Sequence, residues 1–325
     1  MTASTPISFA DVQHARERLA PWLVPTPLRQ YPTFDDLLPG VTVHVKHENV
    51  QPTGSFKVRN GLSTLTALDA SQRACGVVAA STGNHGLGLA YAGRQLGIGV
   101  TICVPRGNNP EKTAAIRAWG ATVVEEGYDY DEAASVAQRL VDTRGLTLAH
   151  STNNVHVLSG AGTMTLEILE QCDHLDVLLI AVGGGSQAVG AITVARALRP
   201  GLRIIGVQAA GAPAAYDSWK ARAPQTTSRA DTFAEGVATR STYALTFPAL
   251  LDGLADFVTV TDADIAEAVR TILTATHHLV EGAGAMGVAA AVKLAAQLRG
   301  QSVGVVFCGG NMDSAVLRRI LNREL

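Results

Sequence analysis

Short apolar runs alternate with helix-like patterns along most of the chain from about residue 76 onward. Apolar runs of roughly four to eight residues are typical of strands buried on both faces, and the longer patterns between them are typical of crossover helices. The sequence therefore predicts an α/β fold with open, twisted, mostly parallel sheets that helices cover. The expected strands are 77–80, 100–104, 122–124, 177–182, 204–207, 257–260 and 303–307, and the expected helices are 85–96, 110–119, 131–141, 188–198 and 262–276.

Three further segments have local patterns of their own. Residues 8–11 (SFAD) have the form of a capping box, which predicts the start of a helix. Residues 41–46 alternate as a half-buried strand does. The polar segment 222–232 has the weakest pattern of all, and we expect a loop there.

Composition and charge narrow the class of protein. At roughly 150 residues per domain, 325 residues predict about two domains. A net charge of −2 and an aromatic content of 5% provide neither the basic field nor the stacking platforms that nucleic-acid binding uses. No apolar run approaches the roughly 20 residues of a membrane span, and residues 1–11 lack the layout of a signal peptide. The 32 glycines indicate many tight turns.

Four cysteines are present without a C-x-x-C pair, and we interpret them as reduced cytosolic thiols. A dinucleotide-binding pattern, Gly282–Gly287, fails the test of its context. The pattern needs a preceding strand and an acidic residue about 20 positions later, but residues 271–281 have a helical pattern and position 307 is Phe. We interpret these glycines as small residues that allow close helix packing. The chain is therefore expected to be a cytoplasmic enzyme or binding protein.

The segment Gln51–Arg59 contains the most specific pattern in the chain. A proline and a glycine mark a turn, Thr53 or Ser55 can cap the helix that follows, and Lys57 falls in the first turn of that helix. The helix dipole, with Arg59 two residues away and no acid in the turn, lowers the pKa of a lysine at this position. A neutral amine is what Schiff-base chemistry requires. The alternative is a solvated surface lysine, which does not explain the unfavourable position of the charge.

A glycine-rich turn at Gly183–Gly185 follows one predicted strand and precedes a predicted helix. Backbone N–H groups there can converge on one anion at the helix N-terminus, and the Ser186 hydroxyl can add to them. The alternative is a tight turn without a ligand. The strand-to-helix placement favours a phosphate cradle.

Two other polar turns also follow predicted strands, at the edge where open α/β sheets bind ligands. The turn Ser81–Gly86 offers hydroxyl, amide and backbone donors that suit a carboxylate, although a helix cap by Ser81 or Thr82 would explain half of this pattern. The turn Cys308–Asn311 follows the last predicted strand. Taken alone, Cys308 is most simply a buried structural cysteine.

Together these segments resemble the fold-type II pyridoxal phosphate (PLP) enzymes, and most of all the catabolic threonine/serine dehydratase and serine racemase group of the tryptophan synthase β-like superfamily. One lysine, one phosphate cradle and one cysteine at strand or loop ends are the parts of such a site. The resemblance rests on the motifs QPTGSFKVR, STGNHG, VGGGS and CGGN. It extends over the whole chain through the runs TFAEGVA, LTFPALLDGLADFVTVTDADI and LVEGAGAMGVAA.

The resemblance implies a role for each matching residue. Lys57 would form the Schiff base with PLP and act as the base at the substrate Cα, with Phe56 packed beside the cofactor. Asn84 would hydrogen-bond the 3-oxygen of the cofactor, Cys308 would face its pyridine nitrogen, and Gly236 would lie near the ring. The phosphate would be held by Gly183, Gly184, Gly185, Ser186 and Gln187, and the substrate carboxylate by Ser81, Thr82, Gly83 and His85.

The expected activity follows from these roles. A thiol is a weak neutral partner, so the pyridine nitrogen need not stay protonated, which suits β-elimination better than a long-lived carbanion. We expect a carbon–nitrogen lyase: an ammonia-lyase (dehydratase) that converts an L-β-hydroxy-α-amino acid of the threonine, serine or 3-phenylserine type to a 2-keto acid and ammonia. One alternative is a serine racemase in which Thr82 acts as an acid/base with Lys57. Another is a non-catalytic binding protein, against which the intact Lys57 speaks.

Departures from the family concern metals and regulation. Metal-activated relatives have a glutamate where this chain has Gln208, and the next carboxylate is Asp217, so no divalent metal site is expected. The chain ends at Leu325 without the added domain of feedback-regulated biosynthetic relatives, so we expect no control by a branched amino acid. The loop 222–232 and the stretch 151–159 are expected to influence the choice of substrate.

The expected organisation is a large PLP-binding domain, residues 1–75 and 151–325, with a small domain, residues 76–150, inserted in it and Lys57 near the cleft. The expected assembly is a cytoplasmic homodimer. Its partner is a small amino-acid substrate, and neither nucleic acid nor a membrane is expected to bind.

Overall fold

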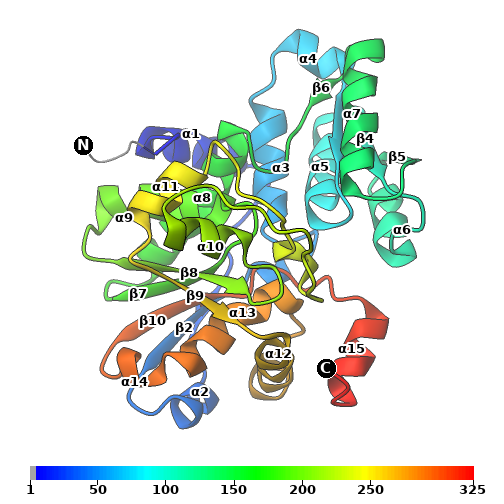
Figure 1. Ribbon diagram of the computed structural model, residues 1–325. Coiled ribbons are helices and arrows are strands. Elements are labelled where there is room, and N and C mark those ends of the chain that lie inside the picture. The colour runs from blue at the N-terminus through cyan, green and yellow to red at the C-terminus, as the bar shows by residue number, and fades with distance from the viewer. Residues whose placement is uncertain (1–4) are drawn as a thin grey trace.

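The computed structural model describes residues 5–325, and within that range the strands form a six-stranded and a four-stranded sheet. The larger sheet has the order β1-β2-β10-β7-β8-β9, and its neighbours are parallel except β1 with β2. The smaller sheet, β5-β4-β3-β6, is parallel throughout. The prediction of mostly parallel sheets covered by helices is therefore confirmed (Figure 1).

The strands take up short parts of the chain. Those of the larger sheet are β1 (Leu28–Arg29), β2 (Thr42–Lys46), β7 (Val177–Ala181), β8 (Arg203–Ala209), β9 (Asp256–Val260) and β10 (Ser302–Val306). Those of the smaller sheet are β3 (Val77–Ala80), β4 (Val100–Val104), β5 (Thr122–Glu125) and β6 (Thr147–Leu148).

Helices connect the strands and cover the sheets. Those before β7 are α1 (Phe9–Leu19), α2 (Pro32–Leu37), α3 (Lys57–Thr66), α4 (Ala70–Cys75), α5 (Asn84–Leu96), α6 (Pro110–Ala118), α7 (Tyr130–Arg144) and α8 (Val155–Gln171), with the 3-10 turn η1 (Glu48–Val50). Those after it are α9 (Ser186–Leu198), α10 (Ala214–Ala221), α11 (Phe247–Gly253), α12 (Asp262–Thr276), α13 (Gly282–Lys293), α14 (Ala295–Leu298) and α15 (Ser314–Leu321), with η2 (Glu235–Val237).

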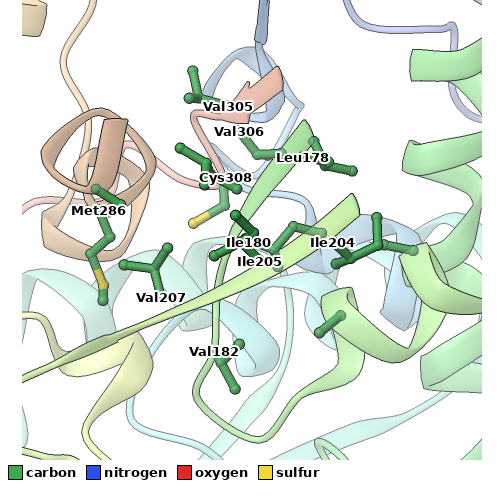
Figure 2. Close-up of a cluster of buried hydrophobic side chains, with 14 of the residues drawn as sticks. Leu178, Ile180, Val182, Ile204, Ile205, Val207, Met286, Val305, Val306 and Cys308 are labelled. Atoms are coloured by element: carbon green, nitrogen blue, oxygen red, sulfur yellow. The ribbon is translucent and has the colours of Figure 1, made fainter. Parts of the chain in front are cut away.

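The main hydrophobic core lies on the central strands of the larger sheet. Helices α8 and α9 lie on one side of this sheet and α12 and α13 on the other (Figure 1). Both faces are therefore buried, which is why β7 and β10 are apolar without alternation. Leu178 and Ile180 of β7, Val305 of β10 and Met286 of α13 belong to this core, and Cys308 lies at its edge just after β10 (Figure 2).

A second core surrounds the smaller sheet and includes residues of helix α3, which lies outside residues 76–150. Val58, Leu62 and Leu65 of α3 are buried in this core. Helices α3 and α5 approach so closely that a Cβ on Gly61 would lie 2.2 Å from the carbonyl oxygen of Gly88. Helix α3 therefore links the two sheets. The domain boundaries at 75 and 151 stay a prediction.

The predicted strands and helices occur where expected, with ends shifted by a few residues, and α12 has its predicted bounds. The capping box at Ser8 and Asp11 is present, and 222–232 is irregular after Arg222 apart from an isolated bridge at Thr226. The alternation expected over 41–46 stops at Lys46, which is fully buried because its amine is held in an ion pair.

The prediction that residues 271–281 are helical is wrong for residues 277–281. Helix α12 ends at Thr276 because His277 takes a left-handed conformation with φ +58°, a common way for a helix to end. Helix α13 then begins at Gly282, with Glu281 at its N-cap. Within residues 5–325, no helix is long and apolar enough to cross a membrane.

Candidate active site

The polar turns predicted to bind ligands all lie at the carboxyl ends of parallel strands. Gly183–Gly185 follows β7, Ser81–Gly83 follows β3, and Cys308–Asn311 follows β10. Helix α3 starts beside the third turn, because the Phe56 N–H donates to the carbonyl oxygen of Cys308 at 3.0 Å. The topology thus brings together turns from both sheets and the first residue of α3, as expected of a ligand site in an α/β protein.

Lys57 is the first residue of α3, and its amine lies at the centre of this group of turns. The amine nitrogen is 4.6 Å from the centre of the Phe56 ring. It is close enough to Cys308 and Glu281 for both to influence its pKa, and it in turn influences the pKa of His85. Within residues 5–325, no carboxylate forms an ion pair with it.

Burial lowers the pKa of Lys57 to about 8, against the opposing effects of Cys308 and Glu281. The predicted direction of the shift is confirmed. Of its two predicted causes, the effect of Arg59 is wrong, and that of the helix dipole stays a prediction. Arg59 does not act on the amine, because its guanidinium is held by two buried carboxylates, those of Glu48 and Glu167. Residues close in sequence therefore face different surroundings.

The predicted side-chain caps of α3 are absent. Its N-cap is Phe56, which makes no side-chain hydrogen bond to the helix. The hydroxyls of Thr53 and Ser55 are buried and have no partner among the described residues. The start of α3 is held instead by backbone contacts, since Ser55 also forms an isolated bridge with Gly309.

The glycine loop after β7 is shaped so that a side chain at Gly183 or Gly184 would collide with neighbouring atoms. A Cβ on Gly183 would lie 2.6 Å from the carbonyl oxygen of Gly236, and one on Gly184 would lie 2.2 Å from the hydroxyl of Thr152. Gly185 has φ +93°, which favours glycine. Helix α9 starts directly after it without a side-chain cap, so its first N–H groups remain available to an anion.

Gln187 contributes to this site differently from the expectation. Its side chain lies near the thiol of Cys308, at the neighbouring strand end, and influences the pKa of that thiol. Burial raises the pKa of Cys308 to about 12; Glu281 adds to this shift, and Gln187 opposes it. The thiol is therefore protonated at neutral pH, as the neutral partner predicted from the sequence requires.

The polar side chains of the turn after β3 have two different roles. The Ser81 hydroxyl accepts from the N–H of Gly86 at 2.9 Å and of Gly83 at 3.3 Å, so it stabilises the start of α5 as a cap does. Thr82 and Asn84 are partly exposed. Ser81 therefore stabilises the helix start, as the alternative of a helix cap predicts, while the side chain of Thr82 remains accessible to a ligand.

His85 is buried and its hydrogen-bonding state is fixed. Nε2 lies 2.9 Å from the carbonyl oxygen of Ala149, which can only accept, so Nε2 carries the hydrogen. Nδ1 is then an acceptor, and it has no partner within the described residues. Burial lowers the pKa of His85 to about 3, with Lys57 acting in the same direction. Its side chain is therefore neutral and cannot donate to a carboxylate.

Two residues that the sequence did not single out complete the site, Glu281 and Asn311. Asn84 donates from Nδ2 to Glu281 Oε1 at 2.7 Å. Asn311 donates to Asn84 Oδ1 at 2.7 Å and to the carbonyl oxygen of Thr53 at 2.9 Å. These bonds join all the strand-end motifs except the glycine loop and fix the orientation of the Asn84 amide. Both residues lie within runs that carried the family resemblance, LVEGAGAMGVAA and CGGN, which is the signal that could have found them.

Glu281 is the most perturbed carboxyl group of the site. Burial raises its pKa to about 7, Glu235 adds to the shift, and Lys112, the hydrogen bond from Asn84 and Lys57 oppose it. Its side chain is enclosed by protein but retains some accessible surface. This combination is typical of a group that lines a deep pocket.

The pocket opens beside Glu281. Lys112 of α6 crosses its mouth and forms an ion pair with Glu235, and its Cδ lies 3.5 Å from where a Cβ on Gly83 would stand. Asn109 also contacts Asp313 across the same opening. The residues that line the pocket are Lys112, Phe233, Glu235, Gly236, Glu281, Gly282, Ala283, Asn311, Met312, Asp313 and Val316.

No group of three or more His, Cys, Asp or Glu side chains in the described part of the chain is arranged to hold a metal ion. The Gln208 carboxamide accepts from the N–H of Tyr216 at 2.8 Å. The expectation that this chain lacks a divalent site stays a prediction.

An enclosed amine at the start of α3 that has no ion pair within residues 5–325, an uncapped glycine-rich helix start and a protonated thiol after a strand define a site for a phosphorylated aldehyde cofactor. The comparisons agree. A model of the family "Pyridoxal-phosphate dependent enzyme" matches residues 19–309, and the chain belongs to this family.

Similar proteins include two named lyases. The chain is 34% identical over 319 residues to an L-threonine ammonia-lyase of Thermotoga maritima, covering 98% of this chain and 79% of the relative. It is 36% identical over 306 residues to an L-threo-3-hydroxyaspartate ammonia-lyase of a Pseudomonas species, covering 94% and 96%. Among solved structures, that of maize serine racemase matches with a TM-score of 0.92 and 28% identity over 98% of both chains. The resemblance noted from the sequence is confirmed.

Proposed function

We propose that this protein is a PLP-dependent ammonia-lyase that converts an L-β-hydroxy-α-amino acid to a 2-keto acid and ammonia. The observation that carries the proposal is the Lys57 amine, enclosed by protein with a pKa of about 8, near Cys308 and Glu281. Two relatives named ammonia-lyases, at 34% and 36% identity, support the lyase activity.

The residues of the site fit the cofactor in the roles that the family resemblance implies. Lys57 would hold PLP through its amine, and the N–H groups of 183–187 would hold the phosphate at the start of α9. Cys308 would meet the pyridine nitrogen, with Gln187 near its thiol. Asn84 would hydrogen-bond the ring oxygen with the second hydrogen of its amide, since the first is given to Glu281. Phe56 and Gly236 would border the ring.

Lys57 performs the proton transfer in this proposal. When bound, PLP withdraws electrons from the substrate Cα and so makes its proton removable. A lysine amine whose pKa is lowered by burial is neutral in a useful fraction near pH 8 and can accept that proton. Overall, the proton removed from Cα and the β-hydroxyl leave together as one water, and addition of water to the unsaturated product gives the 2-keto acid and ammonia.

The substrate carboxylate would bind at the turn after β3. The N–H groups of Ser81 and Gly83 already donate to the Cys103 carbonyl oxygen and to the Ser81 hydroxyl. The Thr82 hydroxyl and the N–H groups of Thr82 and His85 are donors that remain, because the His85 ring presents an acceptor. We therefore assign His85 to this site through its backbone, and Ser81 and Gly83 as residues that shape the turn.

The pocket favours a neutral side chain on the substrate. Three carboxyl groups, of Glu235, Glu281 and Asp313, line it together with one cation, Lys112, which is already paired with Glu235. A second carboxylate on the substrate would be repelled there. We propose threonine, serine or 3-phenylserine rather than 3-hydroxyaspartate as the preferred type.

A substrate panel tests this function. The purified protein with PLP is incubated with L-threonine, L-serine, L-threo-3-phenylserine and L-threo-3-hydroxyaspartate, and 2-keto acid and ammonia are measured. The expected result is equal amounts of both products, with a higher kcat/KM for a neutral substrate. No keto acid from any of the four would overturn the lyase assignment, and a preference for hydroxyaspartate would overturn the argument from pocket charge alone.

Racemisation is the second candidate, and one observation favours it. The Thr82 hydroxyl is on a partly exposed turn of the site, and the fold matches that of maize serine racemase. Chiral analysis of the serine that remains after partial reaction distinguishes the two activities. Racemisation would be supported if the wild-type protein produces D-serine and Thr82→Val does not. Serine that stays fully in the L form would rule racemisation out.

The assembly and location complete the proposal. We propose a cytoplasmic homodimer with a small domain at 76–150 inserted in a large domain at 1–75 and 151–325. The separate four-stranded sheet, whose strands fall between residues 77 and 148, supports this division. Gel filtration with light scattering tests the dimer, for which about twice the chain mass of 33.9 kDa is expected.

A further inference from the structure

Four ionised side chains lie together in the interior behind α3. Lys46, Glu48, Arg59 and Glu167 have side-chain exposures of 0%, 0%, 1% and 3%. Two cations balance two carboxylates, so the group carries no net charge. Buried ion pairs of this kind are weak evidence for stability, because well-packed apolar residues often stabilise a fold as much or more. The cluster therefore calls for an explanation other than stability alone.

Arg59 uses every hydrogen-bond donor it has. Nε and Nη2 donate to the two oxygens of Glu48, both at 2.8 Å. Nη1 and Nη2 donate to the two oxygens of Glu167, at 2.6 and 2.7 Å. The remaining hydrogen of Nη1 goes to the hydroxyl of Thr163 at 3.2 Å. Two bidentate pairs and a fifth bond fix both the position and the plane of the guanidinium.

Glu48 links this cluster to the segment that carries Lys57. It lies in η1, and the Gln51 side chain donates to its Oε2 at 3.1 Å while Thr26 donates to its Oε1 at 2.5 Å. The residues between Glu48 and Arg59 form a loop, and the ion pair between these two residues joins its ends. Lys57 is part of that loop.

Backbone contacts hold the residues just before helix α3, but no side-chain cap helps to set its rotation at this end. Arg59 follows Lys57 by two residues, which turns it by about 200° to the opposite side of the helix. Glu167 belongs to α8, on which α3 packs. A guanidinium fixed against α8 on one side therefore determines where the amine of Lys57 points on the other.

We propose that Arg59 is a positioning residue for Lys57. The Glu48–Arg59 pair closes the loop, Glu167 sets the rotation of α3, and together they hold the Lys57 amine at the cofactor site. Lys46 balances the second carboxylate, since its amine donates to Glu167 at 2.7 Å and to Gln171 at 3.0 Å. This inference rests on the proposed function of Lys57 as the cofactor-binding lysine.

The test compares four variants of the protein with PLP bound. Arg59→Met removes the positioning contacts and leaves a surplus carboxylate. Arg59→Met with Glu48→Gln removes the same contacts but restores charge balance, because Glu167 keeps Lys46. Arg59→Lys keeps the charge without the bidentate geometry. Leu65→Ala, a buried residue of the same helix in the second core, is the matched control for simple destabilisation.

Three quantities are measured: the unfolding midpoint, the cofactor absorption as a function of pH, and kcat separately from KM. Arg59→Met is expected to lower the midpoint and to reduce kcat on the order of 10²-fold, because a small misplacement of a reacting group has effects of that size. The double variant is expected to regain most of the midpoint but not kcat, and to keep a shifted pH midpoint of absorption. Arg59→Lys should recover part of kcat, and Leu65→Ala should lower only the unfolding midpoint.

The results separate the two possible failures. A double variant with wild-type kcat and a wild-type absorption profile would show that Arg59 serves stability alone, which overturns the proposal. A shift of absorption in Leu65→Ala as large as in Arg59→Met would do the same. A wild-type protein without cofactor absorption would overturn the proposed function and this inference with it, whereas a band that Arg59→Met leaves unchanged overturns the inference alone.

Discussion

The two sides of α3 contain similar side chains in opposite electrostatic states. Behind the helix, burial alone would raise the pKa of Glu48, but Arg59 and its hydrogen bonds hold that pKa below its usual range. In front of the helix, burial raises the pKa of Glu281 to about 7 and lowers that of Lys57 to about 8. The charged groups behind α3 have exposures of 0–3%, whereas Glu281 and Lys57 are enclosed by protein but keep some accessible surface. Accessible surface weakens the effect of burial on a pKa, so it does not explain the larger shifts in front of the helix.

The difference lies in how fully each charge is compensated. Each carboxylate behind α3 meets a cation at 2.6 to 2.8 Å, and the guanidinium has a partner for every hydrogen. In the pocket, Glu281 has one hydrogen bond from a neutral amide, and Lys57 forms no ion pair within residues 5–325. Groups with compensated charges form a frame, and groups whose charge is left uncompensated can exchange protons near neutral pH. The following predictions test this contrast.

The largest effect is expected for Lys57→Ala, on the pocket side. The variant removes both the group that holds PLP and the base at the substrate Cα, so activity should fall by at least about 10²–10⁴-fold. The cofactor absorption band near the violet end of the visible spectrum should also be lost. Circular dichroism should show an unchanged secondary structure. A variant that keeps the band would show that another amine holds the cofactor.

The next largest effect is expected behind α3, for Glu167→Gln. This change leaves Arg59 and Lys46 with a single carboxylate between them in the interior, and breaking a buried pair in this way costs about 3–5 kcal/mol of unfolding free energy. The matched control is Glu170→Gln, one turn further along α8. Glu170 pairs with Arg16 at the surface, where such a pair is worth about 0–1 kcal/mol. Urea unfolding that gives equal losses for the two variants would contradict the framework role.

Much of the pocket was predictable from the sequence because its parts follow local rules. Apolar runs located the strands, and glycine-rich turns after them located the ligand edge. The position of Lys57 in the first turn of a helix followed from the turn residues before it. These inferences need only neighbours within a few residues.

The rest depends on contacts between distant residues. Closeness in sequence predicts that Arg59 acts on Lys57. The guanidinium of Arg59 instead pairs with Glu167, which is 108 positions away. The tautomer of His85 depends on the carbonyl of Ala149, 64 positions away. Glu281 was placed in a helical pattern, and only the left-handed turn at His277 brings it to the pocket. No local pattern specifies such pairings.

The smallest of the three effects is expected for Glu281→Gln, and it has a defined sign. The pKa of Glu281 is raised from 4.5 to about 7, chiefly by burial. Between these values the unfolded chain has released the proton that the folded protein still holds, so the native state is stabilised below pH 4.5 and loses that stability as pH rises to about 7. Glutamine has no proton to lose, so the variant should gain stability relative to wild type across this window.

The gain is measured as the difference in unfolding free energy between Glu281→Gln and wild type at pH 5 and at pH 8. At about 1.4 kcal/mol per pKa unit, the difference should increase on the order of 3 kcal/mol between the two conditions. Groups that titrate identically in both proteins cancel in the comparison. If the Glu281→Gln difference were the same at both pH values, Glu281 would carry its charge throughout, and the two sides of α3 would not differ in charge compensation.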